Sequence, residues 1–182
     1  MNRILYILLI IGLYSCGVNH NTKKKTENVE TKKSTTTLKD FEFLQDFEKN
    51  KTKFITDTIQ LYDHSTDGGD LVIFQSNNFE YDVLDFWLYG ETGKLNYTYW
   101  TKKNRNTEFK FVRQLAYDYD RPYYEENYKT DSTIYYLSYS DSKTRLFDIN
   151  NSEIINPEQV VKIKLELETF FRDVTKGIEI IK

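Results

Sequence analysis

The chain has 182 residues, a formal net charge of −3 and a single cysteine. One cysteine excludes an intrachain disulfide, so the stability of the protein must come from a packed core. From residue 41 onward the chain carries 18 basic and 25 acidic side chains, a net charge of 18 − 25 = −7 that disfavours nucleic-acid binding.

Residues 1–15 have the layout of an export signal. Arg3 supplies positive charge, and residues 4–14 form an apolar run that is too short to span a bilayer, because a transmembrane helix needs about 20 apolar residues. The sequence Leu13-Tyr14-Ser15-Cys16 then resembles the lipobox of bacterial lipoproteins. The resemblance implies cleavage before Cys16 and attachment of lipid, with acyl chains such as palmitate, to its sulfur. The alternative is an ordinary secretory signal that ends by chance at a cysteine.

Residues 16–37 comprise this cysteine and a flexible polar tether. Val18 and Val29 are the only aliphatic residues after Cys16, so the segment buries too little apolar surface to fold. Its lysine clusters either touch anionic lipid headgroups or form a solvated spacer. Gly17 stands where many lipoproteins retained in the inner membrane have aspartate. By resemblance, this favours the outer membrane, on the side that faces the periplasm.

The composition of residues 38–182 predicts one globular α+β domain. A chain of about 145 residues can bury a single core, and no Pro- or Gly-rich linker divides it. Alternating apolar residues and Gly- or Asn-containing turns predict an antiparallel meander of six to seven strands. The expected strands cover residues 59–61, 71–75, 79–89, 95–101, 109–117, 133–140 and 145–149. In the third strand, the second half is expected to be buried on both sides. In the fifth, Phe109, Phe111, Leu115 and Tyr117 are expected to share one face.

A helix is expected at each end of the domain, both packed on one face of the sheet. Near the N-terminus, Thr37 and Asp40 resemble a capping box. An apolar stripe follows it at Phe43, Leu44 and Phe47. Near the C-terminus, Asn156 caps a helix with Pro157 at its first position, and Gly177 can end it. Its apolar stripe comprises Val160, Ile163, Leu167, Phe170, Phe171 and Val174. Residues 161–168 also alternate as a strand would, but the helical stripe is longer and favours a helix.

Two segments partly match ligand-binding loops, and neither completes its pattern. The first, third, fifth and sixth places of a calcium loop are matched by Asp63, Ser65, Asp67 and Gly68. The twelfth place, where a bidentate glutamate is required, is Phe74. Residues 90–94 are two residues shorter than a phosphate-binding loop, and no Ser or Thr follows Lys94. Both segments therefore predict tight turns.

Catalytic groups are equally hard to assign. His64 is the one histidine outside the tether, so any Ser-His-Asp arrangement would have to use it. The carboxylate pairs Asp82–Asp85 and Glu125–Glu126 would suit glycoside hydrolysis at the right separation. Such pairs arise by chance in a chain with 28 acidic residues. The sequence therefore predicts no catalytic residue, no metal ligand and no cofactor.

The connection at residues 118–131 is the most informative stretch of the domain. It gathers Tyr119, Arg121, Tyr123, Tyr124 and Tyr128 on the longest loop of the expected meander. Tyrosine combines contact area with a polar tip and little rotamer entropy, which is typical of binding loops. Further aromatic residues extend this surface across the sheet in the binding interpretation: Trp87, Tyr97, Tyr99 and Trp100. In the alternative, these rings are half-buried strand residues that cover a modest core.

Two functions are consistent with these features. The first is a lipid-tethered binding module that presents its aromatic surface to an envelope protein, a glycan or an incoming toxin, in the manner of an immunity protein. The second is an envelope hydrolase that uses paired carboxylates. The binding module is the preferred hypothesis.

Overall fold

A computed structural model describes residues 41–103, 105–140, 143–176 and 178, all of which belong to the compact unit Thr31–Lys182. Several sequence predictions fall outside these residues: the signal segment, Cys16, the tether, the Thr37–Asp40 capping box and Gly177.

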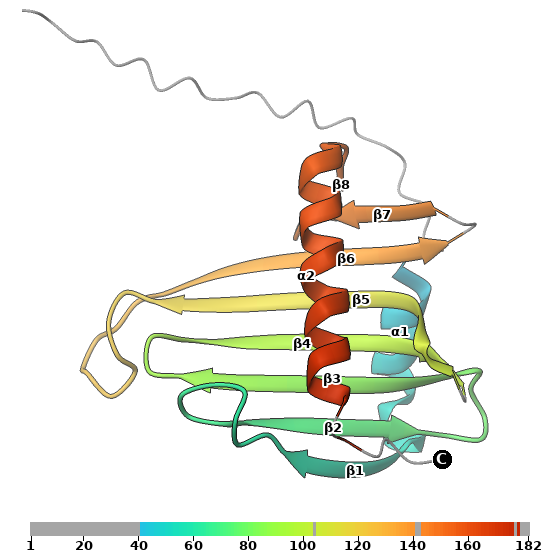
Figure 1. Ribbon diagram of the computed structural model, residues 1–182, viewed down its shortest axis with the longest axis horizontal. Helices are drawn as coiled ribbons and strands as arrows, with labels where there is room; N and C mark the ends of the chain where they lie inside the picture. Colours follow the sequence, from blue (N-terminus) through green and yellow to red (C-terminus); the bar gives the residue numbers. More distant parts are fainter. Residues whose placement is uncertain (1–40, 104, 141–142, 177, 179–182) are drawn as a thin grey trace, which may run out of the picture. The chain divides into compact units, whose positions relative to one another are not determined.

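The described residues form one antiparallel sheet whose strands follow chain order (Figure 1). The strands are β1 (Ile55–Gln60), β2 (Gly69–Gln75), β3 (Tyr81–Gly90), β4 (Gly93–Lys102), β5 (Arg105–Tyr119), β6 (Thr130–Ser140), β7 (Lys143–Phe147) and β8 (Glu153–Ile154). The predicted antiparallel meander is confirmed, with 8 strands instead of six to seven in this part of the chain. The unpredicted strand is β8, whose two residues are too few to show a periodic pattern.

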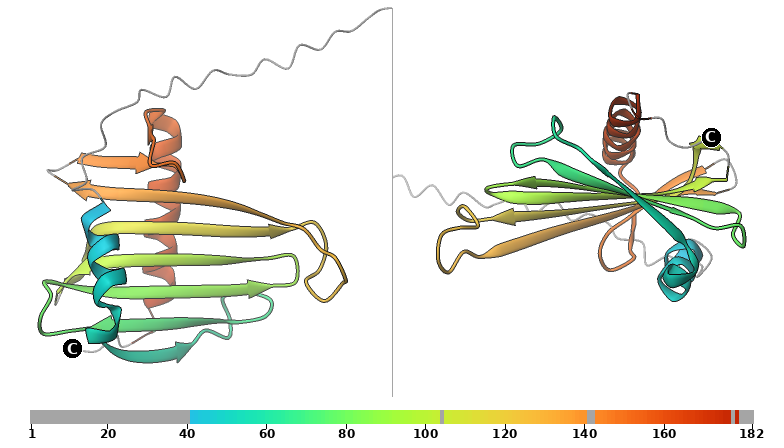
Figure 2. Two further views of the ribbon diagram at one scale, coloured as in Figure 1. Left: turned by 180° about the vertical axis from the view of Figure 1, so that it is seen from behind. Right: turned by 90° about the horizontal axis from the view of Figure 1, so that it is seen from below.

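The two α-helices lie on opposite faces of this sheet (Figure 2). They are α1 (Glu42–Asn50), which continues into the short 3-10 turn η2 (Lys51–Lys53), and α2 (Pro157–Thr175). The prediction that both helices share one face was wrong. Alternate residues of β3 explain the arrangement, since Leu84 belongs to the core beneath α2 and Val83 to the core beneath α1. A strand that is apolar on both sides requires cover on both sides.

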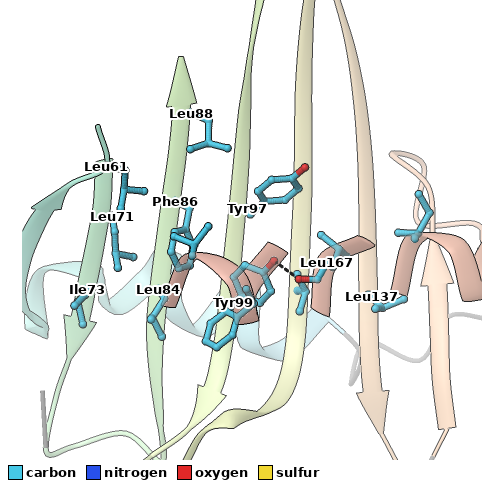
Figure 3. Close-up of a cluster of buried hydrophobic side chains, with 14 of the residues drawn as sticks. Leu61, Leu71, Ile73, Leu84, Phe86, Leu88, Tyr97, Tyr99, Leu137 and Leu167 are labelled. Carbon is cyan, nitrogen blue, oxygen red and sulfur yellow. Dashed lines mark hydrogen bonds between the residues drawn. The ribbon is translucent and has the colours of Figure 1, made fainter. Parts of the chain in front are cut away.

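The core beneath α2 is mainly aliphatic (Figure 3). Buried residues of the helix include Ile163, Leu167 and Phe171, as the predicted stripe requires. Asn156 caps the helix, because its side chain accepts hydrogen bonds from the main-chain N–H groups of Glu158 and Gln159 at 3.0 and 3.3 Å. The helix interpretation of residues 161–168 is confirmed.

The core beneath α1 is mainly aromatic. Its buried members are Phe41, Phe47, Phe54, Phe74, Tyr81, Val83, Trp100, Phe111 and Phe147. Phe43 and Leu44 pack against this cluster, so the predicted stripe of the first helix is confirmed. Ring pairs meet edge to face, for example Phe47 and Trp100 at 5.8 Å between centroids.

The pairing of β4 with β5 contains a bulge. Trp100 pairs with Phe111, and the next residue, Thr101, pairs with Phe109, so Lys110 has no partner in the ladder. One extra residue reverses the side on which the following side chains lie. Phe109 therefore joins the α2 side and Phe111 the α1 side, although they are two residues apart. The expectation that these two residues share a face was wrong for this reason.

The sheet extends well beyond α1 on the face that this helix covers (Figure 2). Along β3, residues 81–84 are buried on both sides, whereas Trp87 is half-buried and Tyr89 is 36% exposed. Two-sided burial was expected in the second half of this strand but occurs in the first half, because α1 lies over the first half only. This leaves an area on the same face of the sheet that neither described helix covers.

Candidate binding surface

We call this uncovered area the open face. It is built from three neighbouring strands whose side chains line up in cross-strand rows: Asp85–Thr98–Arg113, Trp87–Asn96–Leu115 and Tyr89–Lys94–Tyr117. Each row takes one residue from each of β3, β4 and β5, because the antiparallel register places these residues directly opposite one another.

The centre of the open face is a hydrogen-bonded polar network. The carboxylate of Asp85 accepts from Nδ2 of Asn96 and Oγ1 of Thr98, both at 2.7 Å, and from Nε1 of Trp87 at 3.1 Å. Nη2 of Arg113 donates to Asn96 Oδ1 at 3.1 Å and to Thr98 Oγ1 at 3.0 Å. Asn96 and Thr98 thus link an acid to a base across the sheet.

The two central members of this network are buried although neither described helix covers them. Asn96 is 0% exposed and Thr98 is 1% exposed. In the described structure, Nε of Arg113 is buried without a hydrogen-bond partner. Such an enclosed donor is costly, so Arg113 is held in place at some expense to stability.

An ordered aromatic layer borders the network. Nζ of Lys94 lies 5.4 Å from the ring centroid of Trp87 and 4.7 Å from that of Tyr117, so one ammonium group bridges two rings. The hydroxyl of Tyr89 donates to Asp70 at 2.9 Å. Partial burial and this carboxylate raise the pKa of Tyr89. These contacts restrict the rings before any partner arrives.

The loop between β5 and β6 continues this surface at one end of the sheet. It is attached to the β3–β4 hairpin, since the N–H of Tyr123 donates to the carbonyl of Glu91 at 2.8 Å and the N–H of Tyr119 donates to the carbonyl of Thr92 at 2.9 Å. The base of the loop is closed by two hydrogen bonds between Asp120 and Lys129. The N–H of Lys129 also lowers the pKa of the Asp120 carboxyl.

The loop displays its tyrosines rather than burying them. Tyr123 is 51% exposed, Tyr124 64% and Tyr128 41%. Tyr119 and Tyr128 contact each other at 5.0 Å between ring centroids, and Tyr123 and Tyr124 at 5.6 Å. Arg121 forms an exposed ion pair with Asp120 at 3.4 Å. The loop therefore presents paired rings on a backbone that is fixed by hydrogen bonds.

A depression of about 600 Å³ adjoins the same end of the sheet. Its lining includes Tyr89, Lys94 and Tyr117 from the rows described above, together with Glu91 of the hairpin and His64 of the β1–β2 connection.

The structure brings some of the predicted binding residues together and separates others. Trp87 lies on the open face, and Tyr119, Arg121, Tyr123, Tyr124 and Tyr128 lie in or beside the attached loop. Trp100 is 0% exposed beneath α1, so its assignment to an accessible surface was wrong. It lies on the same side of the sheet as Trp87 but at the end that the helix covers. Tyr97 and Tyr99 are buried on the α2 side.

Sequence reasoning missed Lys94, Tyr117 and the polar network as parts of the surface. A signal existed for Asn96 and Thr98, because polar residues at alternate positions of a strand indicate a face without an apolar cover. Nothing in the sequence indicated that Asp85 and Arg113 would meet the same two side chains, because that depends on the register of three strands.

The residues considered for catalysis or metal binding lie apart. Asp82 and Asp85 are three residues apart in β3 and therefore lie on opposite faces of the sheet. Glu125 and Glu126 are exposed in the loop. Within the described ranges, no group of three or more His, Cys, Asp or Glu side chains is placed to hold a metal ion. None of the described helices combines the length and apolar character needed to cross a bilayer.

Comparison with known proteins gives no relative: no family model, no curated protein and no solved structure matches this chain. Function is therefore argued from the geometry.

Proposed function

We propose that this protein is a lipid-anchored binding module of the bacterial cell envelope, with the open face and the attached loop as its binding surface. The observation that carries the proposal is the aromatic layer formed by Trp87, Lys94 and Tyr117, which borders the polar network and lies beneath neither described helix. The lipobox supports anchoring through Cys16, and Gly17 after it favours the outer membrane, facing the periplasm.

The composition of the surface favours a protein partner. Tyr, Trp and Arg are the residue types that most often dominate binding energy at protein interfaces. Their side chains are held by mutual contacts and hydrogen bonds, which lowers the entropy lost on association. The rows on β3, β4 and β5 form a broad surface, and the depression of about 600 Å³ takes up one end of it, whereas small ligands prefer concave sites. An envelope protein or an incoming toxin therefore fits this surface better than a glycan does.

Cross-linking in cells tests the binding surface. We would compare partners trapped by the wild-type chain with those trapped by a Tyr123→Ser/Tyr124→Ser variant, in which both altered rings are exposed. Tyr62→Ser is the matched control, because this tyrosine is 76% exposed and lies outside the proposed surface. We expect the double variant to lose a partner that the control retains. Identical sets of partners for all three proteins would overturn the proposal.

Labelling with radioactive palmitate tests the anchor separately. The wild-type chain should incorporate label and fractionate with membranes, and Cys16→Ser should do neither. If the wild-type chain incorporated no label, the proposed membrane location would be contradicted. The proposed binding surface would still stand, since the two parts of the proposal rest on different residues.

A further inference from the structure

A pocket of about 630 Å³ lies between α2 and the sheet, on the face opposite the proposed binding surface. We call it the helix-side pocket. Its lining consists of Phe109, Tyr139, Lys164, Glu168, Phe171, Arg172, Thr175 and Lys176. Pockets that bind small organic molecules typically measure roughly 300–1,000 Å³, combine apolar walls with a few charged groups, and occur between packed elements.

Three aromatic rings give this pocket its apolar wall. Phe109 lies 4.9 Å from Phe171 and 5.8 Å from Tyr139, measured between ring centroids. Phe109 occupies this position because of the β4–β5 bulge, without which it would be on the α1 side with Phe111. Bulges that redirect one side chain are common beside functional sites.

Basic side chains of α2 dominate the rim. Lys164, Glu168, Arg172 and Lys176 are spaced four residues apart and therefore follow one line along the helix. The carboxylate of Glu168 already accepts a hydrogen bond from Lys164 at 2.8 Å and one from the hydroxyl of Tyr139 at 3.1 Å. Arg172 contacts Asp173 at 3.3 Å in an exposed ion pair, which is weak in water.

The charge of this rim is opposite to that of the domain around it. Three cations and one carboxylate line the pocket, whereas residues 41–182 carry a net charge of 18 − 25 = −7. A basic rim above an aromatic wall is complementary to a molecule with an apolar body and a negatively charged group.

We propose that the helix-side pocket binds a small organic anion, with its apolar body against Phe109 and Phe171 and its carboxylate, sulfonate or phosphate group near Arg172 and Lys176. This site is independent of the proposed protein-binding surface, because the two lie on opposite faces of the sheet and share no residue.

A matched pair of fluorescent dyes tests the proposal. Anilinonaphthalenesulfonate has an aromatic body and a sulfonate, and phenylnaphthylamine has the same body without the charge. Both would be titrated into the full-length Cys16→Ser chain and into variants Arg172→Gln, Lys176→Gln and their combination. Lys162→Gln is the control, because Lys162 is an exposed lysine of the same helix that does not line the pocket.

We expect each rim variant to weaken binding of the sulfonate about two- to fivefold and the double variant about tenfold, as is typical of partly exposed charge pairs. Binding of the neutral dye and the behaviour of Lys162→Gln should not change. Equal affinity of the double variant and the wild type for the sulfonate would overturn the proposal, as would equal affinity of the wild type for both dyes.

Amide chemical shifts give a second readout that does not depend on substitution. The sulfonate should shift the amide resonances of Phe109, Tyr139 and Phe171 in the wild-type chain. Shifts confined to other parts of the molecule would place the dye elsewhere and contradict the assignment.

Discussion

The hydroxyl of Tyr99 donates a 2.8 Å hydrogen bond to the main-chain carbonyl of Leu167, which joins the middle of β4 to the middle of α2 (Figure 3). Both residues are buried, at 0% and 1% exposure. Together with the hydrogen bonds from Tyr139 to Glu168 and from Gln114 to Glu166, this bond helps to hold α2 at one position along the sheet. The helix-side pocket depends on that position, because Phe171 is one turn beyond Leu167.

Removing this bond should destabilise the domain without unfolding it. Tyr99→Phe keeps the buried ring and deletes the hydroxyl, so the free energy of unfolding should fall by about 0.5–1.5 kcal/mol. Urea denaturation followed by circular dichroism measures the change. Tyr62→Phe serves as the control because its ring is 76% exposed. An unchanged unfolding midpoint for Tyr99→Phe would mean that this hydrogen bond does not stabilise the packing of α2 on the sheet.

Asp85→Asn should weaken the open face. The carboxylate accepts hydrogen bonds from Trp87, Asn96 and Thr98, and an amide cannot accept all three with its single oxygen. We expect a loss of about 1–3 kcal/mol in the free energy of unfolding, because at least one donor of a buried network is left without its acceptor. Chemical denaturation at neutral pH measures this loss. A variant as stable as the wild type would show that the network does not stabilise the fold.

Asp82→Asn should change the free energy of unfolding in the opposite direction from Asp85→Asn. Burial raises the pKa of Asp82, and the opposing effect of Lys103 is smaller. Because the folded state binds this proton more tightly than the unfolded chain does, the charged form lowers stability once the pH exceeds the ordinary Asp pKa of about 3.9. Asp82→Asn should therefore raise the free energy of unfolding at neutral pH.

This gain should shrink as the pH falls and disappear below the ordinary Asp pKa, where Asp82 is protonated in both the folded and the unfolded state. Denaturation curves of the wild type and Asp82→Asn, recorded across the acid range, measure the difference. A stabilising effect that is independent of pH would exclude ionisation of Asp82 as its cause.

Tryptophan fluorescence should distinguish the open face from the part of the same side of the sheet that α1 covers. The chain has two tryptophans, of which Trp100 is 0% exposed and Trp87 half-buried at the surface. Acrylamide should quench the wild type much more than Trp87→Phe, whose remaining indole is enclosed by α1. A wild-type protein and a Trp87→Phe variant with equal quenching would show that Trp87 is not accessible to a partner.

Local periodicity was enough to predict the meander and both helices. Alternation in residues 79–89 and a helical stripe from Val160 to Val174 are properties of adjacent residues, so they can be read without knowing the partners of each strand. The Asn156 cap is equally local. Periodicity fails where an element is too short to repeat, as in Glu153–Ile154.

Which aromatic residues are accessible on the sheet was only partly predictable, because accessibility depends on contacts between distant segments. Trp87 and Trp100 are both aromatic residues in strands and lie on the same side of the sheet, yet one is accessible and the other is enclosed. The difference comes from where α1 crosses the strands, which is a contact between segments far apart in the chain.

The sequence by itself therefore determined the order and type of every helix and strand except the two-residue β8, because these depend on neighbours along the chain. The tertiary structure alone decided which face each helix covers, how the β4–β5 bulge redirects Phe109, and how Asp85 and Arg113 come to share Asn96 and Thr98. Each of these depends on strand register and on the position of a distant helix, and neither is encoded in the pattern of any single segment.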